Sequence, residues 1–229
     1  MTTLSKLFSA LLLFPLLLNT AQAAGMRPEV PALFLDDGGR EATINVQNTD
    51  SSLALLHSSL QTIPEDRENL LIITPQLARV NAGQKQQVRV MLKQGVMLDK
   101  QRMQRINFIS VPQDNGKQNR TRILIGQNIP VIISPASLPQ NLEPWKLLKW
   151  QRNGQTIQVE NPSKYIVRMT DKIDLLPSKN SISLKKTYLL PGEKVLLSLK
   201  ESDASKIKEI RIHPVTRFGV LTTPYVISL

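Results

Sequence analysis

The chain has 229 residues, of which 41% are hydrophobic and 21% charged, and this balance excludes a disordered tail, a collagen-like fibre and a coiled coil. It has a formal charge of +11 but only 4% aromatic residues, so it lacks the interleaved basic and aromatic residues that bind single-stranded nucleic acid. It contains no cysteine, which excludes disulfides, thiolate metal sites and a cysteine nucleophile. We expect a globular protein that binds no nucleic acid and needs no metal or cofactor.

Residues 1–23 have the pattern of a secretory signal peptide. Lys6 precedes the apolar run 7–18, and Ala21 and Ala23 occupy the two positions that a signal peptidase reads. The run is shorter than the roughly 20 apolar residues that a membrane span needs, and no second apolar run follows. The sequence therefore predicts an exported protein in a bacterial periplasm, without membrane insertion; an uncleaved N-terminal anchor is the alternative.

Short runs with apolar residues at every second position follow, which is the pattern of strands with one solvated face. These runs are 42–48, 87–92, 155–160, 165–170, 194–199, 209–213 and 225–228. Turn-forming sequences such as 36–39, 48–51, 81–84 and 114–117 separate the strands of the first half. Regular short strands with such turns indicate antiparallel sandwiches, and 202–208 is expected to form a helical turn.

Two prolines, Pro135 and Pro139, bracket a segment that suits neither a helix nor a central strand. We place the domain boundary there. The expected organisation is a signal peptide at 1–23, an N-terminal domain at 24–136 and a C-terminal domain at 137–229. Each domain, with about 100 residues, is long enough to bury its own core. The second domain is expected to be the smaller and more irregular sandwich.

No group of residues in the sequence indicates catalysis or metal binding. His57 and His213 stand in strand-like stretches without a second ligand at metal-binding spacing. The segment 65–68 holds three carboxylates and interrupts the strand pattern, and a solvated loop is a simpler interpretation than the carboxylate pair of a hydrolase. Trp145 and Trp150 are expected to pack in the core or between the domains. We predict neither enzymatic activity nor a catalytic residue.

The stretch 121–133 is the longest extended segment expected in the chain. Ile123, Ile125 and Ile129 fall on one of its faces. Pro130 has no amide hydrogen to give to a sheet, which favours a strand at a sheet edge. An apolar edge must be covered, so strand addition by a foreign chain competes here with burial as an ordinary last strand of the domain.

Several segments, in order, resemble the PapD-like periplasmic chaperones of the chaperone–usher pilus pathway. They are 39–48, the segment 70–90 with its Pro, Arg, Gly and final Val-Arg, the edge stretch that runs into Pro135, and Leu190-Pro191-Gly192-Glu193. The resemblance implies an all-β chain of two immunoglobulin-like sandwich domains in an L-shaped arrangement. It also implies donor-strand complementation, in which the chaperone lends its seventh strand to a pilus subunit that lacks its own last strand.

The resemblance implies a subunit-binding site on the seventh strand. The donor-strand residues are then Thr121, Ile123, Ile125, Gln127 and Ile129. Family members hold the C-terminal carboxylate of the subunit with an Arg and a Lys, but Ala32 and Pro130 match those positions here. Arg89 or Arg27 is therefore the expected carboxylate anchor. Gln101 and Ser134 match the acid–base pair that the family has between its domains.

The implied partners are pilus subunits, which the chaperone folds and caps, and the outer-membrane usher that receives them. Free protein is expected to be able to self-associate through its exposed edge. The ending 129–131 of the donor strand looks like that of divergent, archaic-type branches. The alternative function is a PapD-like binding or structural module of the periplasm that does not act on pilins.

Overall fold

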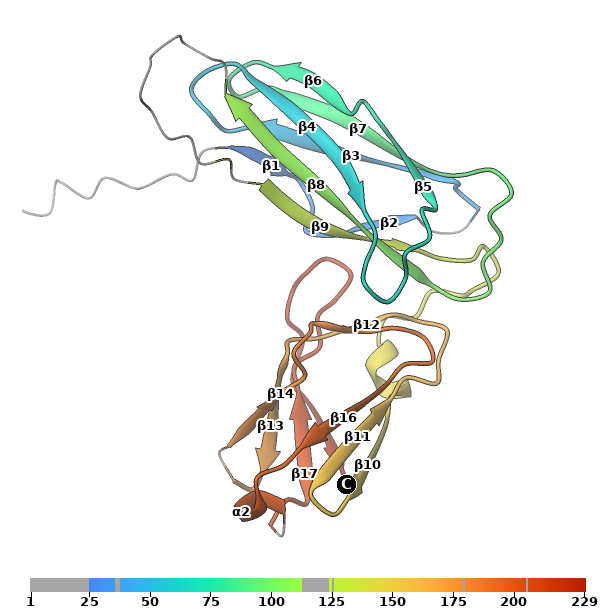
Figure 1. Ribbon diagram of the computed structural model, residues 1–229, viewed down its shortest axis with the longest axis vertical. Helices are drawn as coiled ribbons and strands as arrows, with labels where there is room; N and C mark the ends of the chain where they lie inside the picture. The colour runs from blue at the N-terminus through green and yellow to red at the C-terminus, as the bar shows by residue number, and fades with distance from the viewer. Residues whose placement is uncertain (1–24, 36–37, 113–123, 125, 179, 205) are drawn as a thin grey trace, which may run out of the picture.

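The computed structural model describes residues 25–35, 38–112, 124, 126–178, 180–204 and 206–229. The predicted signal peptide and the predicted turn at 114–117 lie outside these residues. The described chain forms two β-sandwich domains whose long axes are tilted against each other (Figure 1). The prediction of an all-β fold with two sandwich domains is confirmed. In the described part of the chain, no helix has the length and apolarity needed to span a membrane.

The N-terminal domain consists of two sheets with the strand orders β1-β3-β7-β5 and β2-β9-β8-β4-β6. Its strands are β1 (Met26–Pro28), β2 (Leu33–Leu35), β3 (Glu41–Asn48), β4 (Ala54–Gln61), β5 (Leu71–Thr74), β6 (Leu77–Val80), β7 (Lys85–Leu92), β8 (Arg102–Pro112) and β9 (Gly126–Ile133). The longest of these described strands is β8, with 11 residues; of the predicted extended stretch 121–133, the structure describes Leu124 and 126–133. All pairings are antiparallel except that of β2 with β9.

The alternation seen in the sequence explains how the first core forms. Ile44 and Val46 of β3 and Val88 and Val90 of β7 are fully buried, while the residues between them face outward. Residues of the second sheet, such as Phe108, meet them from the other side. Because side chains alternate between the faces of a strand, each sheet presents one apolar layer, and the two layers together form the core.

The C-terminal domain has shorter strands and a separate core, as the sequence predicts. Its elements are η2 (Pro144–Leu147), β10 (Lys149–Asn153), β11 (Thr156–Glu160), β12 (Val167–Arg168), β13 (Lys172–Leu176), β14 (Ser181–Ser183), β15 (Tyr188–Leu189), β16 (Lys194–Ser198), α2 (Glu201–Ala204), β17 (Glu209–Ile212) and β18 (Tyr225–Ser228). They form sheets with the orders β10-β11-β16, β14-β13-β17-β18 and β12-β15. The expected strand 165–170 is reduced to two residues, and the expected helical turn is α2. Trp145 is 6% exposed and Trp150 packs against the same core, consistent with their predicted packing role.

A small apolar cluster joins the two domains. Ile63, Met103 and Ile132 of the first domain contact Ile166 of the second, and all four are at most 4% exposed. Beside this cluster, Gln101 connects both domains by hydrogen bonds. Its Nε2 donates to Ser134 Oγ at 2.9 Å, its Oε1 accepts from the Ile166 amide at 2.7 Å, and its own amide donates to the Lys164 carbonyl at 2.9 Å. The two positions that match the family's acid–base pair therefore do meet, as a neutral pair.

The segment 65–68 is the exposed loop that the sequence suggested, and two of its carboxylates, Glu65 and Asp66, also form ion pairs. Asp66 accepts two hydrogen bonds from the Arg102 guanidinium, which lower the pKa of this carboxyl group. Glu65 reaches across to the second domain, where it accepts from Lys186 at 3.1 Å and from the Tyr188 hydroxyl at 3.1 Å. An unpaired carboxylate is stabilised by full hydration, so ion pairs with residues distant in the sequence are needed to hold this segment against the interface.

Candidate functional site

The outer edge of β9 is open over only part of its length. β8 pairs with β9 from Gly126 to Ile133, whereas β2 covers the other edge only at Val131, Ile132 and Ile133. From Gly126 to Pro130, no described strand pairs with this outer edge. The predicted open edge is therefore present at Gly126–Pro130. The prediction of an open edge is wrong for Val131–Ile133, because β2 pairs with β9 along these three residues.

The structure describes two of the five predicted donor-strand residues. Thr121, Ile123 and Ile125 lie outside the described residues. Gln127 is exposed on the open edge. Ile129 is only 6% exposed and belongs to the core of its own domain, because β9 enters the sandwich at this point. Ile129 can therefore offer a partner its backbone and not its side chain.

Polar side chains from three strands surround the end of this open edge. Asn128 of β9 donates from Nδ2 to Gln61 of β4 at 3.0 Å and to the Oδ1 of Asn107 of β8. Arg105 of β8 donates to the side-chain oxygen of Asn128 and, at 3.1 Å, to its carbonyl. This network holds the Arg105 guanidinium on the outer face of the sheet, facing the second domain. The one polar residue between Gln127 and Ile133, Asn128, was the only sequence signal for it.

Two arginines, Arg105 and Arg168, approach each other from opposite domains. Arg105 lies opposite Pro130 in the β8–β9 register, and Arg168 of β12 donates to the Thr216 carbonyl at 3.4 Å. Burial, and then the positive charge of Arg105, lowers the pKa of Arg168; burial likewise lowers the pKa of Arg105. Within the described residues, neither guanidinium has a carboxylate partner. The cleft thus holds uncompensated positive charge where the open edge ends.

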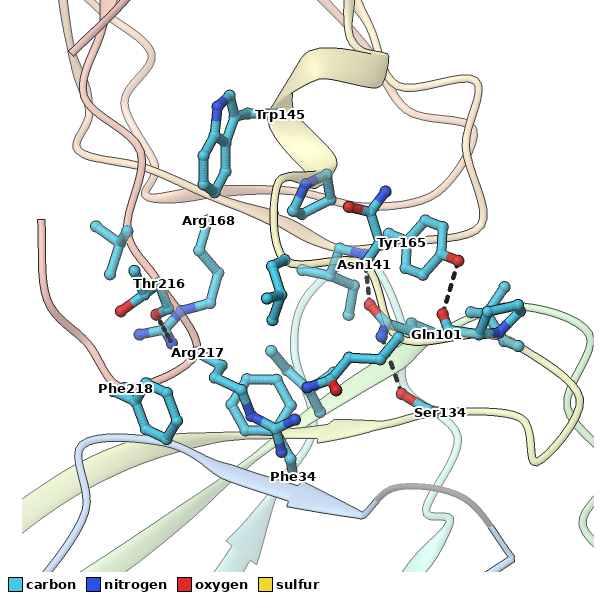
Figure 2. A pocket seen from close by; sticks show the side chains of 18 residues that line it. Phe34, Gln101, Ser134, Asn141, Trp145, Tyr165, Arg168, Thr216, Arg217 and Phe218 are labelled. Carbon is cyan, nitrogen blue, oxygen red and sulfur yellow. Dashed lines mark hydrogen bonds between the residues drawn. The ribbon is translucent and has the colours of Figure 1, made fainter. Parts of the chain in front are cut away.

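An apolar pocket of about 260 Å³ continues from Arg168 between the two domains (Figure 2). Phe34 and Ile132 line it from the first domain, and Trp145 lines it from the second. Arg217, on the loop after β17, places its guanidinium 4.6 Å from the centre of the Phe34 ring. The pocket is therefore a mostly apolar space with cationic groups on one side.

The structure places both expected anchor residues in the other sheet of the first domain. Arg89 of β7 forms an exposed ion pair with Glu41 at 2.6 Å. Arg27 of β1 donates to Gln47 at 2.9 Å. Arg105 and Arg168 are the arginines that the fold brings to the end of the open edge. Sequence reasoning missed this pair, although an arginine inside the apolar run 166–169 was a signal for Arg168.

The carboxylates that a hydrolase would need are already engaged. Glu65 and Asp66 border an interdomain cavity of about 320 Å³, but both form ion pairs. Burial by itself would raise the pKa of Glu65, yet hydrogen bonds to its carboxylate give a net lowering, and the pKa of Asp66 is also lowered. A general acid requires the opposite shift. His213 bonds to Asp174 at 2.9 Å, and no cluster of three metal-ligating residues occurs among the residues described.

Comparisons with known proteins agree with this architecture. Residues 25–139 match the family model of the pili and flagellar-assembly chaperone PapD N-terminal domain, and residues 143–229 match that of the pili assembly chaperone PapD C-terminal domain. The chain is 38% identical over 208 residues to the uncharacterized fimbrial chaperone YhcA of Escherichia coli, which covers 90% of this chain and 92% of that protein. It is 24% identical to the chaperone protein MrkB of Klebsiella pneumoniae, over 79% of this chain and 81% of MrkB.

Solved structures show the same two-domain fold. One chain of the Salmonella enterica complex of the SafA pilin with the SafB chaperone aligns with a TM-score of 0.75 and 20% identity, over 91% of this chain and 98% of that chain. A chain of the CsuC–CsuE complex of chaperone and tip adhesion subunit from Acinetobacter baumannii aligns with a TM-score of 0.63 and 16% identity, over 88% and 97%.

Proposed function

Because this chain belongs to the family of PapD-like pilus assembly chaperones, we propose that it binds a pilus subunit along the open edge of β9 and completes the sheet of that subunit with its own strand. The protein is a chaperone of pilus subunits, and the alternative of a module that does not act on pilins is not favoured. The observation that carries the proposed binding mode is the edge at Gly126–Pro130, which no described strand pairs with on its outer side.

The way in which β9 is held supports strand donation. The end of the strand at Val131–Ile133 is fixed between β2 and β8, while the part before it pairs on one side only. A strand that is already extended loses little conformational freedom when a partner pairs with it, so more of the interaction energy appears as affinity. Ile123 and Ile125 would then fill an apolar groove of the subunit, each contributing roughly 1.5–3 kcal/mol.

We propose that the chaperone binds its subunit in the periplasm, since the signal-peptide pattern at 1–23 directs export. The same edge would let two free copies pair with each other, and release of the subunit would occur at an outer-membrane usher. Neither step needs a cofactor or a covalent reaction. The ion-paired state of Glu65 and Asp66 supports an absence of enzymatic activity.

Two variants with the same added charge test strand donation. Ile125→Asp places a carboxylate on the face that would enter the subunit, whereas Leu124→Asp places it on the opposite face, where Leu124 is 52% exposed. After co-expression with the cognate subunit, Ile125→Asp should lose co-purification and Leu124→Asp should keep it. Ile123→Asp combined with Ile125→Asp should abolish the complex. Circular dichroism checks that each variant is folded. Undiminished co-purification of folded Ile125→Asp would refute the contact.

A further inference from the structure

We propose that a hairpin of the second domain, residues 215–221, is a further contact surface for the subunit. Its apolar tip, formed by Phe218, Val220 and Leu221, packs against an apolar surface of the subunit that is bound along β9. Both domains would thereby hold the subunit, and not the edge of β9 alone. This inference rests on the proposed function, because a strand paired with β9 brings the subunit to the hairpin.

Main-chain hydrogen bonds fix the shape of the 215–221 hairpin. Val215 and Leu221 form a β-bridge, and the Thr216 amide donates to the Val220 carbonyl at 2.8 Å. At its base, the Val215 amide donates to the carbonyl of Arg168 in β12 at 3.0 Å. None of these bonds uses a side chain of the apolar tip. A hairpin that is already formed loses little conformational freedom when a partner packs against it, so more of the contact energy appears as affinity.

The apolar tip is exposed to solvent in the free chaperone. The side chains of Phe218, Val220 and Leu221 are between 59% and 71% exposed. Single exposed apolar residues are common on protein surfaces, but three within four positions concentrate apolar surface at one place, which is typical of an interaction site. A Cβ on Gly219 would lie 2.5 Å from Cγ of the exposed Pro31, so the apolar surface continues onto the first domain.

Contacts with the first domain place the hairpin beside the end of the open edge of β9. Besides the contact with Pro31, the Arg217 guanidinium lies 4.6 Å from the centre of the Phe34 ring (Figure 2). Pro31 precedes β2 and Phe34 belongs to it, and β2 pairs with the last three residues of β9. Figure 1 shows the loop between β17 and β18 extending from the second domain toward the first. The hairpin therefore stands where the open part of β9 gives way to β2.

Strand pairing determines which partner reaches the hairpin. A strand that pairs with Gly126–Pro130 lies in line with β2, because both use the same outer edge of β9. The domain to which that strand belongs must then extend over the neighbouring surface, where the hairpin stands. A subunit that lacks its last strand exposes an apolar groove beside the paired strand, and apolar surface of this kind is what the tip can cover. The bound subunit thus fits the hairpin by position and by chemistry.

The first test measures how well a chaperone variant competes for the subunit. Phe218→Ser combined with Val220→Ser shortens two side chains of the tip and keeps the main-chain bonds. Leu196→Ser combined with Met97→Ser is the matched control, because these side chains are 67% and 94% exposed but lie on β16 and on the loop after β7. Each variant is co-expressed with the cognate subunit and with wild-type chaperone that carries a different tag. The purified complexes should contain the hairpin variant at least tenfold less often than the wild type, and the control about equally often. Circular dichroism checks that the variants are folded.

The second test locates the contact by cross-linking. The chain has no cysteine, so Val220→Cys and Leu196→Cys each create a single attachment site for a benzophenone maleimide. Irradiation of the labelled chaperone–subunit complex should link Val220→Cys to the subunit, whereas Leu196→Cys should give no such product.

The outcomes separate this inference from strand donation. If Ile125→Asp loses the subunit while the hairpin variant competes like the wild type, donation stands and the hairpin inference is overturned. If Ile125→Asp keeps the subunit while the hairpin variant loses it, donation fails and the hairpin contact stands. Absence of a cross-link from Val220→Cys to the subunit overturns the inference. A cross-link between two copies of the chaperone in its place also overturns it and assigns the tip to self-association.

Discussion

Replacement of Gln101 by Ala should weaken the contact between the two domains and lower the free energy of unfolding. The side chain accepts a hydrogen bond from the Ile166 amide at 2.7 Å and donates one to Ser134 at 2.9 Å. Ile166 is 4% exposed, so in Gln101→Ala its amide would be buried without a hydrogen-bond partner. An unsatisfied buried amide costs about 1–3 kcal/mol, and the lost bond to Ser134 adds about 0.5–1.5 kcal/mol. We expect Gln101→Ala to destabilise the protein by about 2–4 kcal/mol.

Urea unfolding followed by the fluorescence of Trp145 and Trp150 measures this loss. With a urea dependence of about 1–3 kcal/mol/M, the midpoint should fall by about 1 M or more. Gln101→Glu is the control, because its carboxylate still accepts from the Ile166 amide and from the Ser134 hydroxyl. It should cost less than about 1 kcal/mol. A midpoint for Gln101→Ala equal to that of the wild type, or equal damage by both variants, would refute the role assigned to these two bonds.

Two further predictions concern the interface. Gly219 and Gly192 both have a positive φ, +76° and +80°, but a Cβ on Gly219 would meet Pro31, whereas a Cβ on Gly192 would meet open space. Gly192→Ala therefore costs only a backbone strain of about 1–2 kcal/mol. Gly219→Ala adds the clash with Pro31 and should lower the melting temperature more. Equal losses would show that the contact with Pro31 is unimportant. Arg102 lowers the pKa of Asp66 below its usual value near 3.8, so the stability that the charged carboxylate provides is present above that pH and is lost as the pH falls through the lowered value. The difference in urea midpoint between wild type and Asp66→Asn should therefore be largest near pH 7 and shrink as the pH falls below 3.8; a difference that stays constant would contradict this assignment.

Local pattern was sufficient for much of the fold. The alternation in 42–48 and 87–92 predicted β3 and β7 because side-chain period is a property of a single strand. It overestimated β12, because alternation says nothing about how long a partner strand is, and β15 offers only two residues. The missing amide of Pro130 predicted a sheet edge, since its effect on a sheet is local as well, but it did not predict that β2 covers Val131–Ile133.

The surroundings of the open edge of β9 depend on contacts between residues that are far apart in the sequence, and no local sequence pattern predicts such contacts. β2 covers Val131 by parallel pairing with Leu33, and these two residues are far apart in the sequence. Arg105 and Arg168 belong to different domains, so only the docking of the sandwiches brings them near each other. The matching of Arg89 and Arg27 to an anchor role had no information about which sheet each would join. Sequence reasoning therefore found the edge strand β9 and missed the charges at the end of its open part.

The neutral pair of Gln101 and Ser134 is consistent with a cationic cleft. Gln101 lines the same pocket as Arg168, so a charge at position 101 would act on the Arg168 guanidinium. A carboxylate there would keep the hydrogen bonds to Ile166 and Ser134, yet it would offset part of the positive charge that Arg168 brings to the pocket. Gln101 makes the same connections without a charge. Gln101 can thus connect the two domains without adding a negative charge beside Arg168.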